Sequence, residues 1–470
     1  MTSPADLACL AGFAAAESGD ADTARRHYME AVALDPTRVD LRLVLANAQR
    51  MAGDLVAART TLQQTVSYAI GAPIEMAFAV ATALVELGDG ASAVPLFARV
   101  ATQRPKDAGV LAALATALRD AGQLAAAATK AQRAVELAPG NATALFTRGQ
   151  VYHARGNTAA AIADYERALQ RRPDHAPTRL QRGYSRLLAD DLIGGWADYE
   201  SRPLPSSTTG ARDWFGEPLN GGSLLLLAEQ GFGDQIQFLR FVARAKERGA
   251  GRIIVEAHAS VVELLIANGF DAVVRGAAQV TDWSAPLLSL PHRLALGGDV
   301  FGEAVPYLRA TPGDVPTLPT PDGRPRLGLV WSGNPEFPRN AERSLGADDV
   351  RRLVGYDAVQ WIGLQQGEAA AALHGHIPST GALADWSVTA RVLASLDGLV
   401  TTCTGIAHLA GAMGVPTWVV INQVPDWRWG LGTDASPWYP SMHLVRQPRQ
   451  GDWAGAITAL HAMLDATFPR

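Results

Sequence analysis

The chain has 470 residues, of which 48% are hydrophobic and 19% are charged, and its formal net charge is -5 at pH 7. This length is enough for two or three domains, each with its own core. The charge balance gives no broad basic surface, so we expect no nucleic-acid partner. No apolar run approaches the roughly 18 residues of a membrane span. Cys9 and Cys403 form no CxxC pair or disulfide framework, and we therefore expect a cytoplasmic protein.

The first two hundred residues repeat with the period of tetratricopeptide repeats. Pro105, Pro139 and Pro173 share one interval of about 34 residues, and Pro36 precedes Pro105 by about two such intervals. Small residues recur where the second helix of a repeat would cross the first, and aromatic residues follow one turn later. We expect five repeats and a degenerate sixth one, together filling residues 1–202. The five are expected to start near Ala5, Val39, Ile74, Ala108 and Ala142.

A solenoid of this kind presents a concave surface that binds extended peptides or helices. We therefore expect residues 1–202 to hold a protein partner. Self-association into a homo-oligomer is the alternative use of such an array.

The pattern changes after a linker rich in proline, glycine and serine, residues 203–222. Short apolar runs then alternate with helix-length segments, which is typical of parallel sheets with helices on both faces. The first set of expected strands is "LLLLAE", "RIIVEA", "DAVVRG" and "APLLSL", and the second set is "LGLVWSG", "AVQWIGLQ", "LDGLVTT" and "PTWVVI". A proline-rich break near 311–326 separates the two sets. We expect two Rossmann-like domains, 223–320 and 321–470, with ligands outside the carboxyl ends of their strands.

The first of these strands leads into the turn "GFGD", with glycines at Gly231 and Gly233. The third glycine of a dinucleotide fingerprint is missing, because Ile236 stands in its place, and we reject dinucleotide binding. What remains is a strand, a turn and a helix with Asp234 at its N-terminus. Helix capping explains an aspartate at this position without any catalytic function.

Three motifs in the second half carry a family resemblance when they are taken together. They are "AEQGFGDQIQFLRF", "WSGNPEFPRNAERSL" and "TTCTGIAHLAGAMGVPTWVV", in that order. As an ordered set they resemble the ADP-heptose:lipopolysaccharide glycosyltransferase family. The whole chain looks like bacterial proteins that join tetratricopeptide repeats to such a domain, and its layout is similar to that of O-GlcNAc transferases. The resemblance implies an α solenoid followed by an α/β GT-B unit of two Rossmann-like domains.

The resemblance also implies roles for individual residues. Asp234 corresponds to the base that deprotonates the acceptor, and attack opposite the leaving group would invert the anomeric centre. Donor phosphates are expected at the helix start that follows the third strand of the second set, and at polar groups of the second motif. The phosphate-binding residues expected in this way are Thr402, Cys403, Thr404, Gly405, Ile406, Asn334, Arg339 and Arg343. Capping of the helix and solvation of the arginines are the structural alternatives.

Further residues of the same strand ends are candidate contacts to the base or the sugar. They are Gln230, Gly233, Gln235, Trp331, Gln365, Asp426, Trp427 and Arg428. Trp427 and Trp429 could stack on a ligand, although tryptophans are as often packing residues. The resemblance implies a nucleotide-sugar co-substrate, no cofactor and no bound metal.

Two positions depart from the family's pattern. The heptosyltransferases usually carry lysine where this chain has Arg343, and an aspartate associated with the donor where it has Cys403. These departures leave the identity of the donor open. His408 follows Cys403 by a turn and a half in a predicted helix, out of reach as an activating base, so we assign the cysteine to packing.

The expected function is therefore a metal-independent glycosyltransferase that moves a sugar to a hydroxyl of a protein recruited by the repeats. Flagellin is a candidate acceptor by family analogy. Two alternatives stay open at this point. One is a non-enzymatic adaptor with a decayed transferase domain, and the other is a heptosyl-type transferase acting on an envelope saccharide.

Overall fold

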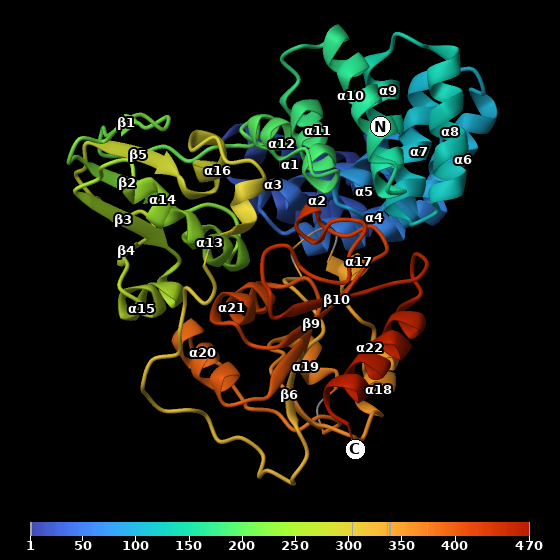
Figure 1. The fold of residues 1–470 in the computed structure, drawn as a ribbon. Helices are drawn as coiled ribbons and strands as arrows, with labels where there is room; N and C mark the ends of the chain where they lie inside the picture. Colours follow the sequence, from blue (N-terminus) through green and yellow to red (C-terminus); the bar gives the residue numbers. More distant parts are fainter. Residues whose placement is uncertain (1, 303, 336, 338–339, 374, 470) are drawn as a thin grey trace. The chain divides into compact units, whose positions relative to one another are not determined.

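A computed structural model describes residues 2–302, 304–335, 337, 340–373 and 375–469 (Figure 1). The chain forms two compact units, Met1–Thr178 and Arg179–Arg470. The first unit is entirely helical, and the second contains two parallel sheets with their helices. No helix among the described residues is long and apolar enough to cross a membrane.

The first unit is a solenoid of helix pairs, as the repeat period predicts. Its helices are α1 Pro4–Glu17, α2 Ala21–Leu34, α3 Val39–Met51, α4 Leu55–Ala69, α5 Ile74–Glu86, α6 Gly90–Gln103, α7 Ala108–Asp120, α8 Leu124–Leu137, α9 Ala142–Ala154 and α10 Thr158–Arg171. Every expected repeat start falls on the first or second residue of a pair's first helix, which confirms the repeats. The helices α2, α6, α8 and α10 each end two residues before a proline, which cannot continue a helix because it lacks an N–H group.

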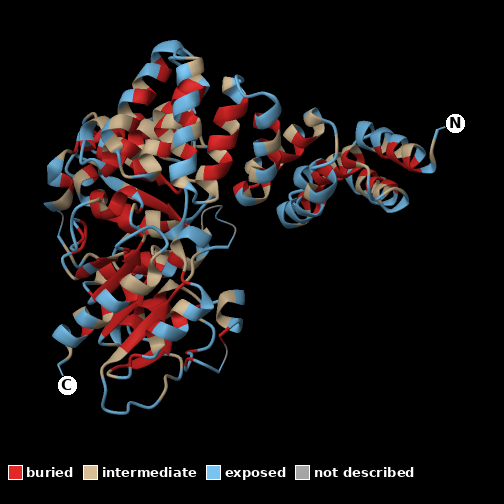
Figure 2. Cartoon of the chain, turned by 90° about the vertical axis from the view of Figure 1, so that its right-hand side faces the viewer, coloured by how far each residue is buried: buried red, intermediate tan, exposed pale blue. Residues whose placement is uncertain are grey.

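Close packing inside each pair explains the small and aromatic residues of the repeat. A Cβ atom on Gly12 would lie 2.5 Å from the ring of Tyr28, and one on Gly149 would lie 2.6 Å from the ring of Tyr165. Both tyrosines are buried. The glycine of one helix therefore makes room for the aromatic ring of the next. Buried residues lie on the sides of the helices that face their neighbours (Figure 2).

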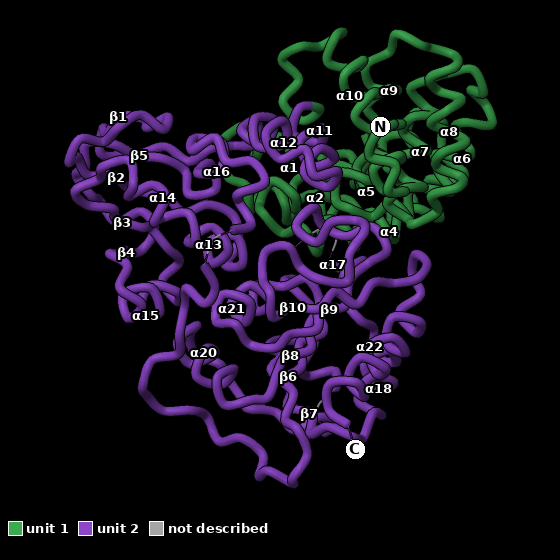
Figure 3. Tube along the Cα trace, viewed as in Figure 1, with its two compact units in different colours: residues 1–178 green, residues 179–470 purple. Residues whose placement is uncertain are grey.

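The sixth repeat exists but belongs to the second unit (Figure 3). It consists of α11 Ala176–Leu188 and α12 Leu192–Tyr199. An ion pair of the fifth repeat, Arg148 with Asp164 at 2.6 Å, recurs one repeat later as Arg182 with Asp198 at 2.7 Å. The aromatic side chains of α12 instead join the core of the α/β part, where the ring of Trp196 lies 5.3 Å from that of Trp427. This shared core is why the unit boundary falls after residue 178 and not after residue 202.

The first sheet of the second unit has five parallel strands in the order β1-β5-β2-β3-β4. The strands are β1 Arg212–Asp213, β2 Ser223–Leu227, β3 Arg252–Ala257, β4 Asp271–Val274 and β5 Trp283–Pro286. The first three strands expected in this half are present, but of the fourth, "APLLSL", only residues 285–286 belong to β5, since Leu287–Ser289 form a 3-10 helix and Leu290 begins α16. The expected linker is more than a connector, since its residues 212–213 form β1 and pair with β5.

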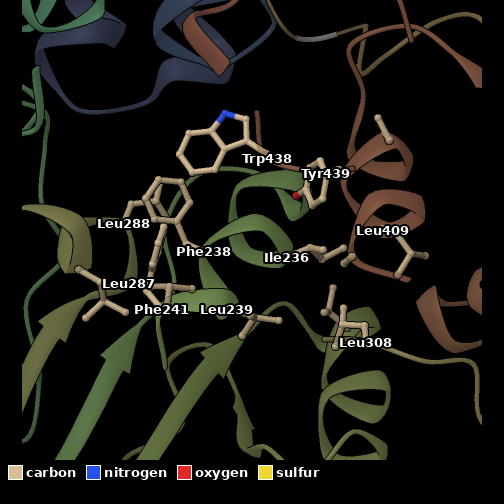
Figure 4. Close-up of a cluster of buried hydrophobic side chains, with 14 of the residues drawn as sticks. Ile236, Phe238, Leu239, Phe241, Leu287, Leu288, Leu308, Leu409, Trp438 and Tyr439 are labelled. Atoms are coloured by element: carbon tan, nitrogen blue, oxygen red, sulfur yellow. The ribbon is translucent and has the colours of Figure 1, made fainter. Parts of the chain in front are cut away.

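The two faces of this sheet are covered differently. One face packs Leu224 and Leu226 against α13 Phe232–Phe238 and α15 Ala259–Ala267 in the main core, and Figure 4 shows the buried side of α13 in that core, with Ile236 facing Leu409. The other face carries a small cluster of strand residues, Leu225, Leu227 and Ile254 with Val273. Linker residues 205–209 lie over it and line a cavity of about 210 Å³. Helices on both faces, as expected from the alternating pattern, are therefore not what this sheet has in the described part of the chain.

The second sheet is also parallel, in the order β10-β9-β8-β6-β7. The strands are β6 Arg326–Val330, β7 Gln360–Gly363, β8 Gly398–Thr401, β9 Thr417–Ile421 and β10 Met442–Arg446. Here helices cover both faces. The helices α18 Ala347–Val354 and α22 Trp453–Thr467 share one core cluster with the sheet, and α20 Trp386–Ala394 and α21 Gly405–Met413 share the other.

Each sheet reverses its strand order at one place, between β2 and β5 in the first and between β6 and β8 in the second. Ligands of open α/β sheets bind outside the carboxyl ends of the strands at such a place. The three motifs of the sequence follow β2, β6 and β8. The fold therefore puts all three at the strand ends where a ligand is expected.

Candidate active site

The first and third motifs meet at a contact between two glycines. A Cβ atom on Gly233, in the first turn of α13, would lie 2.8 Å from Cδ2 of His408 and 3.0 Å from Cα of Gly405. A Cβ atom on Gly405, the first residue of α21, would lie 3.4 Å from the backbone nitrogen of Gly233. Any side chain at Gly233 would meet backbone there. The first and third motifs, far apart in the sequence, are therefore in direct backbone contact.

Asp234 follows directly after this contact and its carboxylate has two roles. Oδ2 accepts a hydrogen bond of 3.0 Å from the backbone N–H of Gly231, which is the capping interaction that the sequence allows. Oδ1 accepts a hydrogen bond of 2.5 Å from Nη2 of Arg428. The side chain remains 22% exposed. Capping and a further function are therefore compatible, since a carboxylate offers about four lone-pair sites.

Arg428 is the fixed partner of this carboxylate. Its Nε donates to Oε1 of Gln237 at 2.7 Å, its Nη1 donates to Oδ1 of Asp426 at 2.9 Å, and its guanidinium lies 4.2 Å from the centre of the Trp427 ring. Its side chain is 8% exposed. Burial disfavours the charge of Arg428, but Asp426 and Asp234 outweigh burial and raise its pKa above the ordinary value. Arg428 thus contacts both Asp234 and Asp426, and the expected contact of Arg428 and Asp426 to a base or sugar stays a prediction.

The tryptophans of the same loop are packing residues in this structure. Trp427 is 6% exposed and its ring packs edge-on against Trp196. Trp429 is fully buried and stacks on His408, with 5.3 Å between the ring centres. Of the two alternatives for these side chains, burial therefore favours packing over stacking on a ligand.

Cys403 and His408 are close in sequence but do not form a catalytic pair. The Cys403 Sγ accepts a hydrogen bond of 3.1 Å from Nε1 of Trp429, and burial, with the charge of Asp426 adding to it, raises the pKa of the thiol. The Nδ1 of His408 lies 3.1 Å from the hydroxyl of Tyr439, and burial holds the pKa of His408 well below its ordinary range. A neutral thiol and a neutral imidazole with other partners fit the packing role assigned to Cys403.

The start of α21 carries a group of open backbone donors. The N–H groups of residues 403–406 have no hydrogen-bond partner among the residues that the structure describes. The hydroxyl of Thr404 does not cap the helix, because it pairs with Thr401 at 2.9 Å. Thr402 is buried and donates its N–H to the carbonyl of Val330 in β6. Open donors at the positive end of a helix dipole are suited to an anion.

The second motif is held in place by Gln365. Its Oε1 accepts hydrogen bonds from the backbone N–H groups of Trp331 and Ser332, at 3.0 and 2.9 Å. Gln365 and Trp331 are both buried. They shape the turn after β6, and their expected contact to a ligand stays a prediction.

Arg343 is the cation of the second motif. Its Nη2 would lie 2.7 Å from a Cβ atom on Gly333, and its guanidinium covers the ring of Phe337 at 4.4 Å. No carboxylate of a described residue lies within ion-pair distance of Arg343, and its charge acts on the thiol of Cys403. Asn334 is exposed in the same turn, and Arg339 lies outside the described residues.

The two glutamines of the first motif support the turn. Gln230 adopts a positive φ of 55° and its Nε2 donates to the hydroxyl of Tyr199 in α12 at 2.8 Å. Gln235 is buried and its Oε1 accepts from the backbone N–H of His258 at 3.3 Å. The sixth repeat thus reaches the candidate site through Tyr199.

A buried ion pair that sequence reasoning missed fills the place where the first sheet reverses. Arg202 donates to both carboxylate oxygens of Glu229, at 2.8 and 2.7 Å, and to the hydroxyl of Ser289 at 2.9 Å. Glu229 also accepts from the N–H of Leu288. Both charged side chains are almost completely buried.

Three aromatic side chains that sequence reasoning also missed surround the glycine contact. We call Phe232, His258 and Trp386 the aromatic ledge. The ring of Phe232 lies 4.7 Å from that of His258 and 5.4 Å from that of Trp386, and Cη2 of Trp386 would lie 3.0 Å from a Cβ atom on Gly405. Phe232 is 39% exposed. The sequence offered one signal for Phe232, because it is an apolar residue between the two glycines of a turn. No local pattern indicates that His258 and Trp386 belong to the site.

Comparisons with known proteins identify the repeats. Two models of the tetratricopeptide repeat match the chain, one at residues 78–142 and 112–176 and the other at residues 15–69. Protein FlbA of Caulobacter vibrioides is 26% identical over 328 residues, which are 57% of this chain and 51% of that protein. The chain thus spans about half the length of this curated relative.

Solved structures of repeat proteins are similar to part of the chain. YrrB, described as a TPR protein with an unusual peptide-binding site, is 19% identical, with 36% of this chain and 88% of that chain covered and a TM-score of 0.30. A tetratricopeptide repeat protein from Parabacteroides merdae is 16% identical, with 42% and 77% covered and a TM-score of 0.35. MamA from Desulfovibrio magneticus is 16% identical, with 37% and 99% covered and a TM-score of 0.31.

Proposed function

We propose that this chain is a glycosyltransferase with a GT-B catalytic unit, which transfers a sugar from a nucleotide-sugar to a hydroxyl of a protein acceptor. One observation carries the proposal. The contact between Gly233 and Gly405 joins the segment that carries Asp234 to the helix start that carries the open backbone donors of α21. A proton acceptor and an anion-binding helix start, one from each sheet, are the two parts that such a transfer needs.

The proposed reaction uses these parts as follows. The acceptor hydroxyl gives its proton to Asp234 while its oxygen forms a bond to the anomeric carbon of the donor sugar. The bond between that carbon and the phosphate oxygen breaks, and its electron pair stays on the phosphate. Attack from the opposite face inverts the anomeric centre. The N–H groups at the start of α21 and the guanidinium of Arg343 stabilise the negative charge that grows on the leaving group.

The proposal includes no metal and no cofactor, because these donors suffice to meet the charge of the phosphate. We place the reaction in the cytoplasm and propose that the repeats bring the protein acceptor to it. A solenoid binds an extended polypeptide along its concave surface. Flagellin is the acceptor that we would test first.

The first test separates nucleotide binding from transfer. Thermal stability of the full chain is measured with ADP, UDP, GDP, CMP and CDP, because a ligand at 100 times its dissociation constant stabilises a fold by about 2.7 kcal/mol. We expect one nucleotide to stabilise the wild type and Asp234→Asn equally, and Arg343→Ala much less. Asp234→Asn, which keeps the shape of the side chain, should abolish sugar transfer.

The two rival functions predict other results. A protein that no nucleotide stabilises is an adaptor, and the transferase proposal then fails. Nucleotide binding together with transfer to a saccharide, and none to protein, indicates the envelope enzyme. Transfer that survives in Asp234→Asn would remove this residue from the mechanism.

A further inference from the structure

The aromatic ledge lies where the two halves of the proposed reaction meet. Phe232 and Asp234 are the two chain neighbours of Gly233, and Gly233 touches Gly405 at the start of α21. Trp386 is the first residue of α20, and its ring lies against Gly405, since Cη2 would be 3.0 Å from a Cβ atom there. The ledge, the carboxylate and the open backbone donors therefore all surround one backbone contact.

We infer that the aromatic ledge is the subsite for the sugar ring of the donor, an inference that rests on the proposed function. The transferred sugar is bonded to a phosphate on one side and is attacked by the acceptor oxygen on the other. A sugar whose phosphate rests on the start of α21, and whose anomeric carbon is attacked beside Asp234, has to lie against the contact between Gly233 and Gly405. Phe232 is exposed beside this contact, and the half-buried Trp386 lies next to its ring.

The chemistry of the ledge fits a pyranose ring. One side of such a ring presents C–H groups, which pack well on the electron-rich face of an aromatic ring. His258 adds a polar edge beside Phe232, since its Nε2 lies 3.3 Å from the carbonyl oxygen of Gln230. The hydroxyl groups of a sugar can pair with such polar atoms while its apolar side rests on Phe232. The tryptophans of the loop after β9 cannot take this place, because they are buried.

Trp386 packs against the main core, but simple packing does not account for the exposure of Phe232. A side chain that only joins two halves of a core is buried, as Ile236 and Phe238 of the same helix are. Phe232 instead keeps 39% of its surface exposed, although it lies beside two other rings. Phe337 is also exposed near the second motif, but the guanidinium of Arg343 covers its ring.

The test compares a nucleotide with the same nucleotide carrying a sugar. The probes are UDP with UDP-glucose, ADP with ADP-glucose, GDP with GDP-mannose, and CMP with CMP-N-acetylneuraminate, each titrated by calorimetry into the full chain. For the pair that binds, Phe232→Ala and Trp386→Ala should weaken the nucleotide-sugar about five- to ten-fold and leave the free nucleotide unchanged. Trp386→Phe, which keeps an aromatic face, should restore most of the loss. Phe215→Ala, a change to another exposed phenylalanine, serves as the matched control.

The outcomes separate this inference from the function on which it rests. If no probe binds the wild type, the proposed function fails and the ledge loses its ligand with it. If the nucleotide and the nucleotide-sugar weaken equally in Phe232→Ala, the ledge serves the nucleotide or the fold, and the inference is wrong. If neither weakens in Phe232→Ala and Trp386→Ala, the sugar lies elsewhere and the inference is also wrong.

Discussion

At the scale of single residues, the site depends on a buried cation, Arg428, whose pairing with Asp234 no pattern in the sequence shows. Arg428 lies 194 positions from Asp234 in the chain, and its guanidinium is shared by Asp234, Asp426 and Gln237. Removing Arg428 leaves the carboxylates of Asp234 and Asp426 partly solvated, but it leaves the buried amide oxygen of Gln237 unpaired, which costs about 1–3 kcal/mol. We therefore expect Arg428→Met to lower the free energy of unfolding by about that amount, measured by urea denaturation.

The matched control is Arg351→Met, which removes an exposed ion pair with Asp348 and should cost less than about 1 kcal/mol. Arg428→Lys keeps the charge but not the planar fork. It should leave the nucleotide affinity unchanged and reduce the rate of transfer about ten-fold or more, because misplacing a catalytic group has effects of this size. Equal stability losses in Arg428→Met and Arg351→Met would contradict a shared structural role for Arg428.

We expect His408 to make the free energy of unfolding of the second unit depend on pH. Burial holds its pKa in the folded state well below the ordinary value of 6.5, so below about pH 6.5 the unfolded chain binds a proton that the folded chain does not. Stability is therefore present above that pH and falls as the pH is lowered, by about 1.4 kcal/mol per unit. Burial lowers the pKa of His461 as well, and it acts in the same direction.

Comparing the wild type with His408→Gln isolates the contribution of His408, since His461 is present in both. The glutamine can still reach the hydroxyl of Tyr439 but does not titrate. We expect the loss of stability between pH 7 and pH 5.5 to be smaller in His408→Gln, measured by urea denaturation at each pH. Parallel curves for the two proteins would show that His408 titrates normally.

At the scale of elements, the sixth repeat packs with the second unit and not with the solenoid unit. Its α12 supplies Trp196 and Tyr199 to the core, and the segment after it supplies Arg202 to Glu229. A fragment of residues 203–470 would lose all three. We expect a fragment of residues 176–470 to unfold cooperatively, as judged by circular dichroism during heating.

The shorter fragment should not fold. Leaving Glu229 unpaired costs about 3–5 kcal/mol, and losing one large buried aromatic side chain costs about as much again. Together these losses approach the 5–15 kcal/mol that stabilises a typical domain. A stable fragment of residues 203–470 would show that the sixth repeat is only a connector.

Regular patterns made most of these elements predictable from the sequence. The repeat period and its prolines predicted the helix pairs of the solenoid, and continuous apolar runs predicted the strands β2 to β4 and β6 to β9. For β5 the apolar run was misleading, because most of it, residues 287–290, is helical. The strand β1 has two exposed residues and carries no pattern, and β10 was missed because the exposed His443 interrupts its apolar run. Only the structure shows that β1 and β10 are strands, because they pair with β5 and β9.

The candidate site was predictable only where one segment carries the signal. Asp234 and the turn at 402–406 stand in local motifs, and the fold brings them together. Partners that come from distant segments could not be inferred in the same way. The ion pair of Asp234 with Arg428 and the contact of Phe232 with Trp386 depend on how the two sheets pack, which no local pattern encodes.

At the scale of the whole molecule, the proposal divides the work between the two units. The solenoid, Met1–Thr178, would hold the acceptor protein, and the second unit would carry the chemistry. Tethering an acceptor in this way raises its effective concentration at the site, and such linkage is commonly worth a factor of about 100 or more in apparent affinity. We expect a fragment of residues 176–470 to have a KM for flagellin raised by about that factor, with kcat changed little.

A short peptide that contains only the serine or threonine to be glycosylated provides the control, because it lacks the rest of the acceptor that the solenoid would bind. The fragment and the full chain should glycosylate this peptide with the same kcat/KM, measured by the transfer of radiolabelled sugar. The difference between the two acceptors then measures the contribution of the solenoid alone. If removal of the solenoid slows the peptide as much as flagellin, the repeats support the catalytic unit and do not select its acceptor. If it slows neither, the solenoid serves another partner.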